Sequence, residues 1–196
     1  GGTNPPTARW IAPILDRLMA ITTNGIERTS PRVDNAWSSN SAWATLRPSL
    51  TGLFTCIHPH TLTSVNGDLF PGLLAFQSNA YYQVTGTNFG ADATAVSASA
   101  GEDSSIKLID PRVGTSSPYS VCSVPGVGVF WFTSDRYVYF VPYGRAHGYF
   151  VGDKIFSTGT TTGTESVNTA ALSQVWMVYY DRFLRIGFPI GSDTFP

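Results

Sequence analysis

Four segments of the chain share one pattern, in which two runs of aromatic or β-branched residues flank a short polar turn. These hairpin-like segments are Arg17–Ser30, Gly72–Thr85, Val127–Val141 and Gln174–Pro189. The turn centres of successive segments lie about 54, 56 and 47 residues apart. This spacing is close to the repeat length expected when four-stranded propeller blades follow one another along a chain. We therefore predict an all-β chain that forms a β-propeller-like array of about four antiparallel blades over residues 9–196.

The alternative all-β architecture is a β-sandwich. A sandwich is expected to show turn signals at short intervals with no longer period, whereas here strong hairpins alternate with long polar stretches. Residues 1–8 are rich in Pro and Gly and are predicted to form an extended lead-in. Because the chain has no initiator Met and ends abruptly at Phe195-Pro196, we expect it to be a segment of a longer protein.

Local signals refine the expected strands. Trp10–Thr22 also fits a helical face, but Pro13 and the Asn24-Gly25 turn favour strands. Pro31–Pro48 is polar and is predicted to be a long outer loop, with Trp37 and Trp43 as anchors. The β-like run Leu53–Leu62 is expected to be interrupted by Pro59, which marks an edge or a turn. The apolar run 126–132 is predicted to be an inner strand that is buried on both faces.

The composition excludes several classes of function. Charged residues make up 13% of the chain, the formal net charge is -1, and the pI is about 6.3, which gives no basic footprint for wrapping nucleic acid. No apolar run reaches the length of a membrane span, and the start does not resemble a signal peptide. So few charges predict a surface partly covered by neighbouring subunits. Cys56 and Cys122 are predicted to be small buried residues.

Few residues are candidates for catalysis or metal binding. His58 and His60 would share one face of a strand near Cys56, but Pro59 between them argues against a regular metal site. His147 lies between glycines and is predicted to be a solvated turn residue. The adjacent carboxylates Glu102 and Asp103 would point apart, unlike the facing pair of a glycosidase.

Two further patterns have structural explanations. Asp135-Arg136 and Asp181-Arg182 occupy equivalent places in two hairpins, where Asp is typical of turns. A cluster of aromatic residues is predicted to pack within and between blades. This cluster comprises Trp131, Tyr137, Tyr139, Phe140, Tyr143, Tyr149 and Phe150. The sequence therefore predicts no catalytic, cofactor-binding or metal-binding residue.

The hairpins also carry a family resemblance. The segments 24–31 (NGIERTSP, followed by Trp37) and 73–86 (LLAFQSNAYYQVTG) resemble the blades of β-propellers in structural proteins of tailed phages. The order continues with Ser120-Val121 and the strand 128–139 (GVFWFTSDRYVY). Val151–Ile155 resembles the segment that opens the next blade, and Tyr179–Pro189 resembles the closing hairpin.

This resemblance implies a component of a virion tail, most like the nozzle-type protein that forms the distal tube of short-tailed phages. It implies a non-enzymatic, homo-oligomeric ring with other tail proteins as partners, around a channel for DNA ejection. A lumen for DNA transit should be neutral to acidic, because many Lys or Arg contacts would trap the phosphate backbone. The alternative is a carbohydrate- or receptor-binding β-propeller, favoured by exposed aromatics and Ser/Thr/Gly-rich loops.

Overall fold

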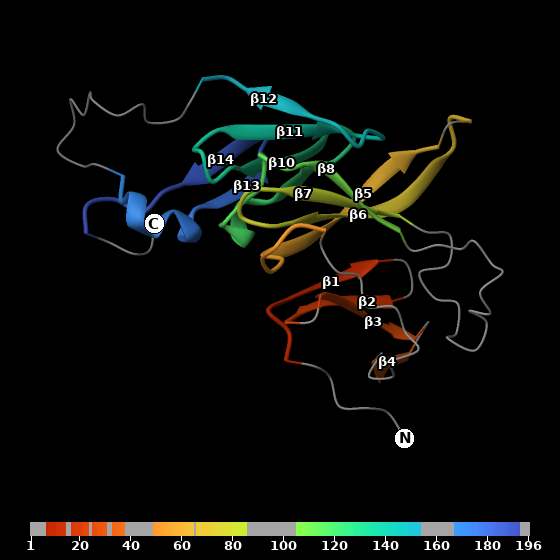
Figure 1. The fold of residues 1–196 in the computed structure, drawn as a ribbon. Helices are drawn as coiled ribbons and strands as arrows, with labels where there is room; N and C mark the ends of the chain where they lie inside the picture. The colour runs from red at the N-terminus through yellow and green to blue at the C-terminus, as the bar shows by residue number, and fades with distance from the viewer. Residues whose placement is uncertain are drawn as a thin grey trace.

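The computed structural model describes residues 7–14, 17–23, 25–30, 33–37, 49–64, 66–85, 105–153 and 167–192. These residues form fourteen strands and two short 3-10 helices, so the predicted all-β class is confirmed (Figure 1). Within this described part, no helix is long and apolar enough to cross a membrane. The predicted lead-in, residues 1–8, lies mostly outside it.

The strands form three four-stranded antiparallel meanders and one two-stranded sheet. Sheet 1 contains β1 (Trp10–Ile14), β2 (Arg17–Thr22), β3 (Gly25–Ser30) and β4 (Val33–Trp37). Sheet 2 contains β5 (Cys56–Thr63), β6 (Leu69–Phe76), β7 (Tyr81–Thr85) and β8 (Ser105–Asp110). Sheet 3 contains β9 (Cys122–Val124), β10 (Gly128–Phe132), β11 (Val138–Pro142) and β12 (Tyr149–Val151). Sheet 4 contains β13 (Trp176–Tyr180) and β14 (Phe183–Gly187). The 3-10 helices are η1 (Pro118–Ser120) and η2 (Thr169–Gln174).

All four predicted hairpins are confirmed. They are the pairs β2–β3, β6–β7, β10–β11 and β13–β14. In each of the first three sheets, the hairpin supplies the two inner strands of the meander. None of the four sheets closes on itself, so the structure supports four antiparallel sheets and leaves the propeller a proposal.

Sheet 2 is covered on both faces by its neighbours. Along β6, Leu73 and Ala75 join the core cluster shared with sheet 1, whereas Leu74 and Phe76 join the cluster shared with sheet 3. This alternation follows from the two-residue period of a strand. A strand buried on both faces needs a continuous apolar run, which is what β6 has.

Sheet 3 repeats this arrangement. Val129 and Trp131 of β10 pack toward sheet 2, and Phe132 packs toward Met177 of sheet 4. The predicted inner strand of 126–132 is therefore confirmed, with β10 between β9 and β11. Gly128 lies so close to the Val141 carbonyl that a Cβ there would overlap it. The four sheets thus stack in the order of the chain.

The first strands of successive sheets lie side by side. The indole N–H of Trp10 in β1 donates to the Ile57 carbonyl of β5 at 3.0 Å. His58 of β5 lies 2.6 Å from the Ser123 hydroxyl of β9, measured between Nε2 and Oγ. β9 in turn contacts β13. The four initial strands therefore run as one series through the molecule.

Two local expectations were wrong, and a third is only partly covered by the described residues. Val33–Trp37, expected in a loop, forms β4 because it pairs with β3. Pro59 does not interrupt its strand, since β5 keeps one register with β6 from Cys56 to Thr63. Tyr149–Val151 pairs with β11 and so ends sheet 3. The segment Val151–Ile155 lies partly outside the described residues, so its likeness to a blade-opening segment stays a prediction. Trp43 lies outside the described residues.

Candidate functional site

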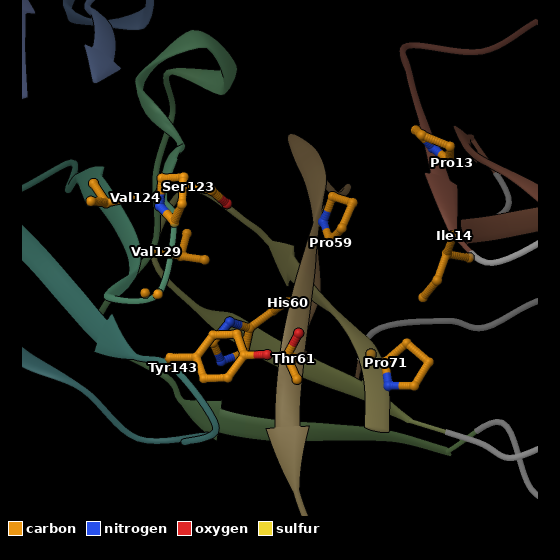
Figure 2. Close-up of a pocket in the computed structure, with 14 residues that line it drawn as sticks. Pro13, Ile14, Pro59, His60, Thr61, Pro71, Ser123, Val124, Val129 and Tyr143 are labelled. Carbon is orange, nitrogen blue, oxygen red and sulfur yellow. The ribbon is translucent and has the colours of Figure 1, made fainter. Parts of the chain in front are cut away.

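A cavity of about 280 Å³ lies where sheets 1, 2 and 3 meet (Figure 2). Its walls come from β1, β5, β6, β9 and β10, together with the turn after β9 and the loop after β11. Its lining residues are Pro13, Ile14, Pro59, His60, Thr61, Pro71, Gly72, Ser123, Val124, Pro125, Gly126, Gly128, Val129 and Tyr143. None of them is Asp, Glu, Lys or Arg, so the cavity suits a neutral group.

Pro59 fits into β5 because this strand lies at the edge of sheet 2. The Ile57 and Thr61 carbonyls and the Thr63 amide bond to groups outside the sheet. The backbone N–H and carbonyl groups of the odd-numbered residues in β5 therefore point away from β6. Pro59 has this parity, so its missing N–H removes no bond of the ladder with β6. The expected edge position of Pro59 is confirmed, and its exposed ring lines the cavity.

His58 and His60 lie on one face of β5, as their spacing predicts. The Nε2–H of His60 donates to the Arg145 carbonyl at 2.7 Å, and His58 pairs with Ser123. Burial, and then the nearby His60, lower the pKa of His58 from 6.5 to about 4. Burial also lowers the pKa of His60, although its bond to the Arg145 carbonyl acts in the opposite direction. Both rings are therefore neutral at pH 7.

The loop after β11 closes one side of the cavity. Gly144 hydrogen-bonds to β5 through both of its backbone polar groups. Its N–H donates to the Thr61 carbonyl at 3.0 Å, and its carbonyl accepts from the Thr63 N–H at 3.1 Å. The hydroxyl of Tyr81 donates to the Ala146 carbonyl at 3.1 Å. These bonds fix exposed Tyr143, whose hydroxyl points toward Thr61 in Figure 2.

The chemistry open to this site is binding more than catalysis. A general base needs a pKa near the working pH, whereas burial moves the pKa of both histidines down. Burial raises the pKa of the Cys56 thiol to about 12, which leaves it protonated and unreactive. No group of three or more His, Cys, Asp or Glu within the described ranges has the geometry of a metal site.

The remaining sequence candidates do not join the cavity lining. Glu102 and Asp103 lie outside the described residues. His147 is exposed in the loop after β11, as predicted. Asp181 and Arg182 form the two-residue turn between β13 and β14, with φ of 50° and 65°. Positive φ at both positions is the signature of a type I′ hairpin turn, so the turn prediction for this pair is confirmed.

Asp135 and Arg136 also lie in a turn, between β10 and β11, and φ of Arg136 is 72°. This supports the same structural explanation for the first of the two Asp-Arg pairs.

The aromatic cluster divides into a buried and an exposed part. Trp131, Tyr139 and Phe140 are buried as predicted, and the ring of Trp131 lies 4.9 Å from that of Phe76 in sheet 2. Tyr149 and Phe150 of edge strand β12 are exposed, but they pack within sheet 3 as predicted, with ring centres 5.4 Å from Phe140 and 5.0 Å from Tyr139. Tyr143, in the loop before β12, is exposed.

Both cysteines are free. Cys56 is fully buried as predicted, whereas Cys122 of β9 is only half-buried. Burial raises the pKa of the Cys122 thiol as well.

Sequence reasoning missed the cavity. Four prolines from four separate segments line it, and they are Pro13, Pro59, Pro71 and Pro125. Each is visible in the sequence as a residue that fits only edges, bulges or turns of a sheet. Prolines recurring within predicted strands were therefore the available signal for an uncovered edge.

No family model matches the chain, and searches of curated proteins and of solved structures each return no match. What the chain does is therefore inferred from its own residues and their arrangement.

Proposed function

We propose that the chain is a non-enzymatic structural subunit of a phage virion tail, a nozzle-type β-propeller that forms part of the channel wall for DNA ejection. One observation carries the proposal: three four-stranded meanders and a hairpin stack in chain order, with their first strands side by side. This stacking supports an arrangement as successive propeller blades. The blade-like motifs at 24–31, 73–86 and 128–139 fall on the inner hairpins of these sheets.

The charge of the chain suits a conduit for DNA. With 12 Lys and Arg against 13 Asp and Glu, it lacks the excess of cations that would hold a phosphate backbone. Purified chain should therefore show no saturable binding to duplex DNA at physiological salt in a fluorescence anisotropy titration. Tight binding under those conditions would contradict a passive channel wall.

The proposed location of the chain in the tail can be tested on purified phage particles. Antibodies raised against the purified chain, coupled to gold, should label purified phage particles that encode it at the distal end of the tail. Labelling of the capsid, or absence of the chain from the particle by mass spectrometry, would reject the proposal.

A carbohydrate- or receptor-binding β-propeller is the second candidate, and the cavity favours it. An exposed aromatic ring, Tyr143, lies beside Thr61 in a neutral cavity that Ser123 also lines (Figure 2). On a glycan array, this candidate predicts reproducible binding to one glycan that is lost in Tyr143→Ala. An array without any saturable signal would reject it.

A further inference from the structure

A second cavity borders the loop after β11. It has a volume of about 550 Å³ and lies where the end of β5, this loop and the start of β12 meet. We call it the Arg145 cavity, and the lining residues that matter here are Thr63, Ser64, Arg145, His147 and Tyr149. Pockets for small ligands usually enclose roughly 300–1,000 Å³, so this cavity has room for a sugar ring with a substituent.

The Arg145 cavity carries positive charge. None of its lining residues is Asp or Glu, whereas Arg145 and His147 both line it and are exposed. Arg145 has no ion-pair partner in the part of the chain that the structure describes. By contrast, the guanidinium of Arg112 lies 3.9 Å from a carboxylate oxygen of Asp110. An exposed guanidinium with no carboxylate beside it is available to an anionic ligand.

The Ser64 hydroxyl adds a neutral donor. Its oxygen accepts a hydrogen bond from the Asp68 N–H at 3.1 Å, and among the described residues no acceptor takes its O–H. Asp68 is exposed in the turn between β5 and β6, and it does not line the cavity. Donors on Ser64 and Arg145 therefore reach the cavity from two segments, which suits the several acceptor oxygens of a carboxylate or phosphate.

The backbone of the loop is fixed, so the Arg145 side chain extends from a defined point. The Arg145 N–H donates to the Pro142 carbonyl at 3.0 Å, and the Arg145 carbonyl accepts from His60 at 2.7 Å. The residue before Arg145 is bonded to β5, and the residue after it accepts from the Tyr81 hydroxyl. A loop that is already ordered loses less conformational entropy when a ligand binds.

An aromatic ring supplies an apolar wall. Tyr149, the first residue of β12, lines the cavity and is 57% exposed. Its ring meets the Phe140 ring edge to face, with centres 5.4 Å apart, which favours one orientation. A pyranose ring has apolar C–H groups as well as hydroxyls, so it suits a cavity that combines this ring with polar donors.

We propose that the Arg145 cavity binds an acidic sugar unit, with the anionic group on Arg145, His147 and Ser64 and the sugar ring against Tyr149. Carboxylate and phosphate groups both match the planar fork of a guanidinium. The inference rests on the second candidate function, a carbohydrate-binding propeller, for which it names the class of ligand. It concerns a different site from the neutral cavity that Tyr143 lines.

The test is a nuclear magnetic resonance titration of the ¹⁵N-labelled chain with three probes at constant pH and ionic strength. The probes are glucuronate, glucose 6-phosphate and glucose. Arg145→Gln removes the cation, and Tyr149→Leu removes the ring but keeps an apolar side chain. Lys107→Gln is the matched control, because it removes an exposed cation from β8 at the opposite edge of sheet 2.

We expect at least one acidic probe to cause saturable shifts of the amide signals of Ser64 and of residues 144–147, and glucose to cause none. A response to glucuronate alone identifies a carboxylated sugar, and a response to glucose 6-phosphate alone identifies a phosphorylated one. Arg145→Gln should raise the dissociation constant at least about 10-fold, because it removes a charge-assisted hydrogen bond. Tyr149→Leu should also weaken binding, and Lys107→Gln should bind like wild type.

Three results would overturn the proposal. They are the absence of saturable shifts at these amides with both acidic probes, equal shifts with glucose, and an Arg145→Gln variant that binds like wild type. A Tyr149→Leu variant that binds like wild type would reject the contact with the sugar ring. Binding of a neutral glycan that is lost in Tyr143→Ala would keep the second candidate function even where this proposal fails.

Discussion

A fall in pH from 7.5 to 5 is expected to destabilise the chain by about 2 kcal/mol through His58 alone. The imidazole has a pKa of about 4 in the folded chain, against its ordinary 6.5. Between these values the unfolded chain binds a proton that the folded chain does not, so stability rises with pH. This stability is fully present above pH 6.5, and it falls as the pH drops toward 4.

The lowered pKa of His60 acts in the same direction. Carboxylates that titrate near pH 4 add their own losses in acid, so the comparison is made above pH 5 and between variants. His58→Gln keeps a group able to bond to Ser123 but removes the titration. It should therefore lose about 2 kcal/mol less than wild type over this range.

The assay is urea unfolding followed by tryptophan fluorescence at pH 7.5, 6.5, 5.5 and 5.0. His147→Gln is the matched control, because His147 is exposed and its replacement should keep the pH dependence of wild type. If His58→Gln and wild type lose the same stability between pH 7.5 and 5, the burial of His58 between β5 and β9 is refuted.

Three further changes test the packing. Trp131→Ala should cost about 3–5 kcal/mol in urea unfolding, because it empties the fully buried centre of the sheet 2–sheet 3 contact; a loss below 1 kcal/mol would contradict that position. Gly114→Ala should lower the free energy of unfolding by about 1–3 kcal/mol or more, because the added Cβ would overlap the backbone of Gln77 and Ala80. An unchanged thermal midpoint would refute this close approach. Arg182→Gly should gain about 1 kcal/mol by relieving a positive φ, and any loss of stability would argue against the type I′ turn.

The hairpins were predictable because their signals are local. A turn such as that after Phe76 has polar residues between apolar runs, and both features are read within about 15 residues of sequence. Short edge strands were not predictable. β4 lies in a polar stretch and β12 has three residues, so their pairing partners, and not their own composition, decide their structure.

The site was predictable only in part. The shared face of His58 and His60 follows from their spacing on a strand. Their partners do not, since Ser123 and Arg145 are 65 and 85 residues away and reach them only through the stacking of sheets. The cavity has the same origin, because its prolines come together only after three sheets have assembled.

The most direct test of the proposed role is a cryo-electron microscopy map of the tail of a phage particle that encodes this chain. We predict density at the distal tail that fits the three meanders and the hairpin in chain order, with copies repeated around the tail axis. The proposed role would be contradicted if these sheets did not fit the tail map and the chain were absent from the particles.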